Sequence, residues 1–196
     1  MPSKPFPITS DRCLRRRMVL IVVGFATMVV LSFFSRRTPV PEDVADRPTV
    51  ACASLSLRDG RLFLDNATNP FSGWMWDHYP DGTLRSRSEV SNGVLHGWSE
   101  GWHTNGQIQV REQFSRGVSD GTRTKWYASG AKLSEAAIVN GRLDGRFRRW
   151  HENGQLAEEA TLRDGKPDGV ARAWYSDGNL RAEVNVNNGE VLKRNF

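Results

Sequence analysis

The sequence predicts an all-β protein, an elongated meander of about five 24-residue β-hairpin repeats preceded by one N-terminal transmembrane helix. Glycines recur every 24 residues, turn dipeptides separate runs in which apolar and polar residues alternate, and an uncharged apolar segment lies near the N-terminus. We expect five parts, which are a cytoplasmic basic N-terminus (1–17), a transmembrane signal anchor (18–34), a linker (35–54), capping strands (55–72) and the five repeats (73–196).

The 24-residue period is set by three glycines that keep one phase through every unit. The first, called the marker glycine below, begins units 1 to 5 at Gly73, Gly97, Gly121, Gly145 and Gly169. A second glycine follows nine residues later and a third follows after eleven more. This self-similarity indicates a repeat architecture, in which each unit buries its apolar face against its neighbours.

Each unit is predicted to be a β-hairpin. A large ring stands five residues after the marker glycine, Trp in units 2 to 5 and His78 in unit 1, and a turn such as PDG, TNG or ENG follows. Asn-Gly and Asp-Gly between extended runs predict a tight turn whose two central residues have positive φ. Alternating apolar residues after the turn, as in GQIQVREQF, predict a strand with one buried face. Ten such strands give a sheet on the order of 50 Å long.

Two stretches depart from the frame. In unit 3, Lys132 holds an expected apolar position and Leu133 is out of phase, which suggests a local bulge. Before unit 1, the stretch from Leu55 to Gly73 contains two apolar runs outside the 24-residue frame. We interpret this stretch as a capping pair of strands, because terminal repeats need a modified outer face.

The run from Met18 to Phe34 is seventeen residues long, contains no charge, and lies between two arginine clusters. Its length is near the lower limit of about 17–25 residues for spanning a bilayer. A cleaved signal peptide has an apolar core of about 7–15 residues and a small-residue cleavage site. This run is longer and FFSRRTP follows it, which favours an uncleaved anchor over cleavage. The positive-inside tendency then places the N-terminus in the cytoplasm and the repeat domain outside, periplasmic or extracellular.

The basic composition belongs to the N-terminal segment. Residues 1–37 carry a net charge of +6, whereas residues 38–196 carry −1. A near-neutral body lacks the basic surface that phosphate binding requires, so we expect no nucleic-acid partner. The two cysteines, Cys13 and Cys52, are too few for a disulfide framework.

No catalytic, cofactor-binding or metal-binding residues are predicted, and no small-molecule substrate. His103 and His151 occupy one repeat position two units apart, about 19 Å in a regular meander, which is too far for shared metal coordination. Three glutamates also share one repeat position, and their even spacing of about 10 Å favours a solvated ladder over a catalytic pair. They are Glu135, Glu159 and Glu183.

Trp74, Trp76 and Trp98 are the candidate partner-binding residues, because units 1 and 2 contain more tryptophan than the frame requires. One interpretation is that they close off the end of the sheet. The other is that they form an exposed aromatic patch for a protein or glycan, since tryptophan is enriched at binding hot spots.

The unit G-x4-W-[YH]-x2-[NDS]-G-x-L, followed by NG-x2-DG, resembles the MORN-repeat variant of many bacterial proteins, including those labelled YwqK-type antitoxins. The resemblance covers roughly residues 55–192 and all five units. It implies an elongated, twisted meander of hairpins with no cofactor and no established catalytic residues. Contact with lipid or with a protein partner is the looser implication of the wider MORN family.

Three functions remain open at this point, and the second, a hydrolase or other enzyme, is the one that the repeats disfavour. The first is a membrane-anchored, non-enzymatic interaction module at the cytoplasmic membrane, which binds an unknown protein or envelope component. An enzyme needs converging groups in a concave site, whereas repeats offer evenly spaced equivalents. The alternative is a YwqK-type antitoxin-like protein that neutralises a partner toxin. That alternative requires a cytoplasmic body, because an exported domain cannot meet a cytoplasmic toxin.

Overall fold

The computed structural model describes residues 47–195 of the 196-residue chain. The predicted basic N-terminus (1–17), the predicted transmembrane segment (18–34) and the first part of the predicted linker lie outside these residues. Between residues 47 and 195, no helix has the length and apolar character needed to span a membrane.

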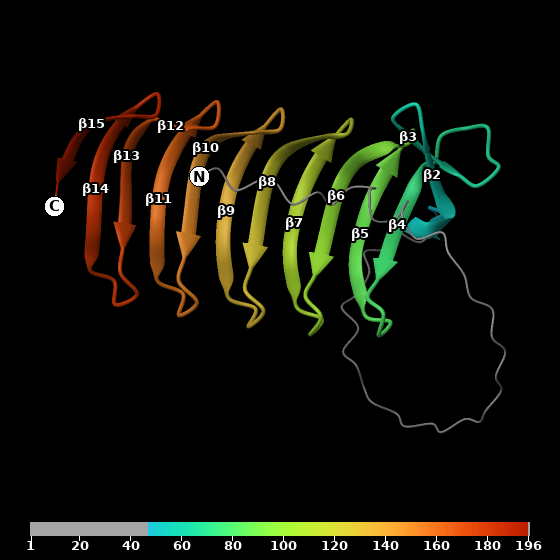
Figure 1. The fold of residues 1–196 in the computed structure, drawn as a ribbon, viewed down its shortest axis with the longest axis horizontal. Coiled ribbons are helices and arrows are strands. Elements are labelled where there is room, and N and C mark those ends of the chain that lie inside the picture. The colour runs from blue at the N-terminus through green and yellow to red at the C-terminus, as the bar shows by residue number, and fades with distance from the viewer. Residues whose placement is uncertain (1–46, 196) are drawn as a thin grey trace, which may run out of the picture.

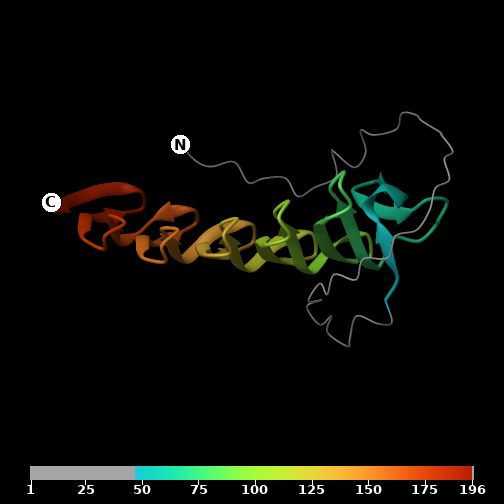
Figure 2. The same cartoon turned by 90° about the horizontal axis from the view of Figure 1, so that it is seen from below.

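The repeats form one meander in which consecutive strands pair antiparallel, confirming the all-β prediction (Figure 1). Seen from below, the units stand in a single row (Figure 2). The strands are β4 (Gly73–His78), β5 (Leu84–Ser91), β6 (Val94–Trp102), β7 (Ile108–Ser115), β8 (Val118–Trp126), β9 (Lys132–Val139), β10 (Arg142–Trp150), β11 (Leu156–Arg163), β12 (Lys166–Pro167), β13 (Gly169–Trp174), β14 (Leu180–Asn187) and β15 (Glu190–Asn195). The short β12 pairs with β11, and β12 and β13 together take the place of one continuous first strand.

Two kinds of turn alternate along the meander, and the prediction assigned positive φ to the wrong one. In the turn after the large ring, only the glycine has positive φ, as at Gly82 and Gly106. This is a type I turn followed by a left-handed glycine. Two successive positive φ values occur instead at the third glycine, as at Asn92-Gly93 and Asn140-Gly141. In units 1, 2, 4 and 5 the Asn or Asp side chain of this first turn accepts a hydrogen bond from the backbone two residues on, as Asp81 does from Thr83.

The marker glycine bends the first strand of units 2 to 4. Ser88 pairs with Ser99 and Val90 with Leu95, so β6 advances four residues while β5 advances two. The same difference occurs where β8 meets β7 and where β10 meets β9. The φ angle of Gly97 is 98°, which a residue with a Cβ adopts only under strain. This bulge therefore requires glycine at the marker position.

Lys193 stands where the 24-residue period would place the next marker glycine. Val186 pairs with Val191 and Asn185 with Lys193, so β15 advances only two residues while β14 advances one. Lys193 is not among the residues with positive φ. The narrower bulge follows from the loss of the glycine that the wider bulge needs.

Residues 49–71, called the cap below, lie at the N-terminal end of the sheet. Residues 49–54, which the sequence assigned to the linker, form β1 (Thr49–Ala51) and the short 3-10 helix η2 (Cys52–Ser54). β1 pairs in parallel with the edge of β4, and Trp74 N donates to the carbonyl of Pro48. The pair β2 (Leu55–Arg58) and β3 (Arg61–Leu64) follows.

The largest apolar core lies under this cap. Val90 is 2 % exposed and packs with Leu55, Phe71 and Leu95. The cap also bonds to the turn between β5 and β6, because Leu62 N donates to the carbonyl of Gly93 and Gly93 N donates to that of Phe71. The β4–β6 end of the meander is therefore the end with a second layer over it.

Neighbouring units are joined by a hydrogen bond from the residue after the large ring. Tyr79 Oη donates to the carbonyl of Trp102, and Tyr127 Oη donates to that of Trp150, at 2.8 and 2.9 Å. His103 and His151 occupy the same position in units 2 and 4, and each Nε2 lies 3.0 or 2.9 Å from the carbonyl of the next tryptophan. Tyr and His alternate at this position because both carry a polar atom at the right reach.

The bulge suspected at Lys132 is not special to unit 3. Trp126 pairs with Lys132 through the same shift that pairs Trp102 with Ile108 and Trp150 with Leu156. Lys132 keeps its place because Nζ bonds to Glu135 and lies 5.2 Å from the ring centre of Trp150.

Candidate functional site

Strand alternation brings a row of large and charged side chains onto one face of units 1 and 2. Trp76 on β4 pairs with Arg87 on β5, Arg87 pairs with Glu100 on β6, and Glu100 pairs with Arg111 on β7. Because successive residues of a strand point to opposite faces, directly paired residues share a face. We call Arg87, Glu100 and Arg111 the arginine–glutamate row.

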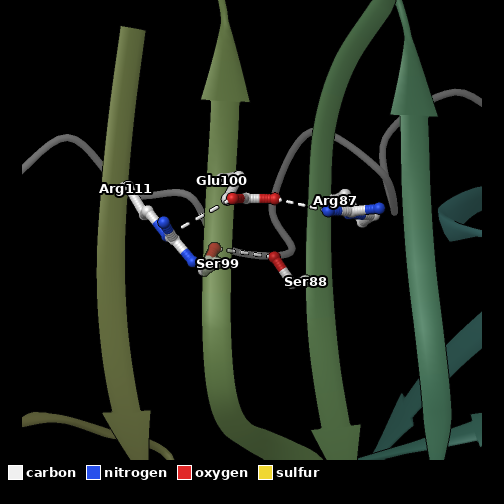
Figure 3. Close-up of polar contacts among 5 residues, drawn as sticks. All are labelled: Arg87, Ser88, Ser99, Glu100 and Arg111. Carbon is white, nitrogen blue, oxygen red and sulfur yellow. Dashed lines mark hydrogen bonds and ion pairs between the residues drawn. The ribbon is translucent and has the colours of Figure 1, made fainter. Parts of the chain in front are cut away.

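Glu100 is the centre of this row (Figure 3). Its carboxylate accepts a hydrogen bond from Arg87 at 2.7 Å and lies 3.4 Å from Nε of Arg111. The residue is 8 % exposed, so both arginines are needed to offset the cost of removing a carboxylate from water. The row carries one net positive charge, and most of the accessible part belongs to Arg111, whose side chain is 46 % exposed.

The arginines of the row cover tryptophans. The guanidinium carbon of Arg87 lies 4.9 Å from the ring centre of Trp74, and that of Arg111 lies 4.1 Å from the ring centre of Trp98. Both distances are within the range of a cation–π interaction. The planar guanidinium of Arg111 is thereby held in a fixed orientation while part of it faces solvent.

The three predicted aromatic residues therefore have different surroundings. Trp74 is 6 % exposed and is covered by Arg87. Trp98 is half-buried beneath Arg111, and Trp76 meets His78 edge to face with ring centres 4.4 Å apart. A sugar ring needs an indole whose face is open if it is to stack on it. The rings of Trp74 and Trp98 each carry a guanidinium over one face, which leaves less open surface for a glycan.

The opposite face carries buried polar pairs. Oγ of Ser88 and Oγ of Ser99 are hydrogen-bonded at 2.7 Å, and each residue is 1 % exposed (Figure 3). In the next unit, Glu112 is 4 % exposed and accepts hydrogen bonds from Ser119 and Arg123. Burial lowers the pKa of Lys125 below its ordinary value, and the charge of nearby Arg123 lowers it further, partly offset by Glu112. Glu112 is thus stabilised by Ser119 and Arg123, whereas Arg123 and Lys125 repel each other.

Beyond the arginine–glutamate row, charged pairs continue along the same face across units 3 to 5. Glu135 bonds to Lys132 at 2.9 Å, Glu159 to Arg148 at 2.9 Å, and Glu183 to Arg172 at 2.7 Å. The glutamates predicted as a solvated ladder thus stand in ion pairs on one face. General acid and base catalysis by carboxylates requires two of them close together in different environments. The even spacing of these glutamates provides no such pair.

The histidines have structural contacts. His103 and His151 join neighbouring units, His96 Nδ1 lies 3.4 Å from the backbone N of Arg116, and His78 packs against Trp76. Among residues 47–195, no three His, Cys, Asp or Glu side chains are grouped closely enough to hold a metal ion.

Sequence reasoning found the tryptophans but missed the arginines over them. Arg87 and Arg111 hold the same repeat position, 24 residues apart, and Glu100 lies on the strand between them. Cross-strand pairing in the predicted frame would have placed all three in one row. The stacking on Trp74 and Trp98 depends on side-chain rotamers and could not be read from spacing.

The arrangement offers oriented charged groups on an open face, which suits binding. Two segments of the chain, residues 143–164 and 167–188, match the MORN repeat variant family. The chain matches none of the curated proteins. The two matched segments begin 24 residues apart, and they cover the strands β10, β11, β13 and β14 of the meander. The C-terminal region of this chain is therefore built of MORN variant repeats.

Proposed function

We propose that this protein is a membrane-anchored, non-enzymatic interaction module that binds a protein or an envelope component through the face bearing Trp98 and the arginine–glutamate row. The observation that carries the proposal is the half-exposed guanidinium of Arg111, held 4.1 Å above Trp98 and beside the buried Glu100. A fixed guanidinium binds carboxylates with little further loss of side-chain entropy. Arginine and tryptophan are also the residues most enriched at interface hot spots.

Even spacing of the charged pairs supports a binding role over catalysis. An active site needs a nucleophile, a base and a stabilising group that converge on one reacting atom. In the described part of the chain, charged residues pair across strands at repeated positions, and each pair resembles the next. A flat face of this kind contacts a partner over several strands.

The binding face is tested by site-specific crosslinking of the full chain in its native cells. We expect Arg111→Gln to reduce the captured partner at least about fivefold, because an oriented charged hydrogen bond contributes on the order of 1–3 kcal/mol. Arg142→Gln is the matched control, since Arg142 is 69 % exposed and pairs with Asp164 at 3.4 Å near a turn. Equal capture by both variants would remove this face from the proposal.

Anchoring is tested separately. Alkaline phosphatase fused to the C-terminus is active only outside the cytoplasm, so we expect activity from the full chain and resistance of the chain to extraction with alkaline carbonate. Deletion of residues 1–37 should abolish both. An inactive phosphatase with a soluble chain would instead support the cytoplasmic, antitoxin-like alternative, and capture of a toxin in the crosslinking experiment would identify it.

A further inference from the structure

A hollow of about 250 Å³ lies on the sheet between units 4 and 5. Six residues from β10, β11 and β13 line it, namely Arg146, Glu159, Ala160, Thr161, Val170 and Arg172. Its lining therefore combines two guanidinium groups and one carboxylate with the aliphatic groups of Thr161 and Val170, whereas the side chain of Ala160, between Glu159 and Thr161, points to the other face. The volume is about eight times the ~30 Å³ that one water molecule takes in the liquid.

The repeat explains why the hollow is there. The equivalent positions three units earlier are, in the same order, Trp74, Arg87, Ser88, Glu89, Trp98 and Glu100. In units 1 and 2 two indoles fill this part of the face, each beneath an arginine. In units 4 and 5 the positions of those indoles are held by Arg146 and Val170, and Thr161 replaces the longer Glu89. The space that rings occupy at one end of the sheet is left open at the other.

The charges around the hollow hold Arg146 by a longer ion pair than the other charged groups. Arg172 is held by Glu183 at 2.7 Å, and Glu159 is held by Arg148 at 2.9 Å. Arg146 lies 3.6 Å from Glu159 and its side chain is 66 % exposed. Val170, which is 43 % exposed, adds apolar surface that no described residue covers.

We propose that this hollow receives an aromatic side chain of a partner polypeptide, with a neighbouring carboxylate of the partner bound to Arg146. A ring seated against Val170 and Thr161 would lie beside Arg146 and Arg172, which line the hollow. An arginine against an indole is the type of contact that Trp74 and Trp98 make within the chain, where the arginines come from the positions that Glu159 and Glu183 hold in units 4 and 5. The proposal rests on the interaction-module function proposed above and names the chemistry of its partner.

Binding is tested by titrating the purified full-length chain, in detergent micelles, with the peptide acetyl-Asp-Trp-Asp-amide. Methyl NMR signals of Val170 and Thr161 should move upfield in a saturable way, because a ring seated over them shifts nearby protons. Acetyl-Asp-Leu-Asp-amide should bind about tenfold more weakly, since it lacks the cation–π interaction. Equal affinity of the two peptides would overturn the proposal.

Two variants locate the site. Val170→Trp restores the ring that unit 2 carries at Trp98, so it should fill the hollow and abolish peptide binding. The matched control is Val118→Trp, because Val118 is 44 % exposed and lies outside the hollow, and binding should be unchanged. Retained binding by Val170→Trp, or shifts at Trp98 instead of Val170, would contradict the assignment. Inorganic phosphate that competes fully with the peptide would show an anion site only, and would overturn it as well.

The outcome is separable from that of the proposed function. If Arg111→Gln abolishes capture of the cellular partner while Val170→Trp does not, the module function stands and this hollow is not its aromatic site. If the peptide binds at Val170 but neither Arg111→Gln nor Val170→Trp reduces capture of the cellular partner, the hollow binds the peptide and the proposed interaction face is wrong.

Discussion

Glu100 and Glu112 are buried carboxylates on opposite faces of the same sheet, and each depends on arginine from a neighbouring strand. Removing one partner of such a pair leaves a charge that neither water nor protein stabilises, which costs more than the pair contributes when intact. These two residues are therefore the positions at which a single polar substitution should most disturb the repeat.

Replacing Glu112 with glutamine should destabilise the fold by about 2–3 kcal/mol. Arg123 would lose its counter-charge, and the loss is smaller than the ~3–5 kcal/mol of a fully buried pair because the Arg123 side chain is 23 % exposed. Glu135→Gln is the control, since both partners of the Lys132 pair are more than 40 % exposed and the change should stay within ~1 kcal/mol. Chemical denaturation of both variants measures the difference, and equal midpoints would contradict it.

Asp81 allows a prediction about pH. Its pKa lies below the ordinary 3.8, first because the Thr83 hydroxyl donates to it and second because the Thr83 backbone N–H does. Since the folded-state pKa is depressed, the stability from these bonds is fully present above pH 3.8 and is lost as the pH falls through the lower folded value.

Thr83→Val removes the hydroxyl and keeps the backbone donor, so the pKa of Asp81 should rise part of the way towards 3.8. Carboxyl-carbon NMR titration measures it. Asp177 is the internal reference, because its pKa is lowered by Asn179 and should not move. An unchanged Asp81 pKa would show that the hydroxyl is not the main cause.

At the scale of elements, each hairpin depends on the hydrogen bonds that join it to its neighbours. One hairpin alone is marginal in water, and each hairpin here donates to the next from the residue that follows its large ring. Tyr175 is the equivalent residue of unit 5, and its side chain is exposed, with Arg181 5.9 Å from its ring centre.

This difference gives a matched pair of substitutions. Tyr127→Phe removes the bond to the carbonyl of Trp150 and should cost about 1 kcal/mol, the net value of a typical hydrogen bond. Tyr175→Phe removes a hydroxyl that makes no such bond to a described residue, so stability should change by less than ~0.5 kcal/mol. Thermal or denaturant unfolding compares them, and equal losses would mean that the hydroxyl bond does not join the units.

At the scale of the whole molecule, the two ends of the sheet differ. The end at β4–β6 lies under the cap and holds the core of Leu55, Phe71, Val90 and Leu95. The end at β13–β15 gathers exposed apolar side chains on a single layer, namely Val170, Tyr175, Leu180, Val191 and Leu192, which are 43 to 62 % exposed. Stability in a repeat array is a sum over units and their interfaces, so it should decline along the chain.

Native-state hydrogen exchange tests this gradient. Backbone amides of β5 and β6 should exchange most slowly and those of β14 and β15 fastest, because local opening is cheaper where fewer apolar groups are buried. Binding of a partner at the hollow should slow exchange in β13 in particular. Uniform protection from β4 to β15 would indicate a single cooperative unit and would contradict an array with unequal ends.

The sequence by itself determined the hairpin meander, its period and its phase. Regular glycine spacing and alternating polarity act locally, so they specify a strand or a turn whatever lies beside it, as Gly93 and Gly141 do at their turns. The predicted anchor over residues 18–34 is likewise a property of composition, and it remains a prediction, because it lies outside the described residues.

Only the tertiary structure decided what the two faces carry. Arg87 over Trp74, the hollow beside Arg146 and the pairing of β1 with β4 join residues from different strands through side-chain rotamers and register. The narrower bulge at Lys193 belongs here too, since its effect is visible only against the partner strand. A local pattern fixes the backbone of each unit, whereas the surface it presents depends on how neighbouring units pack.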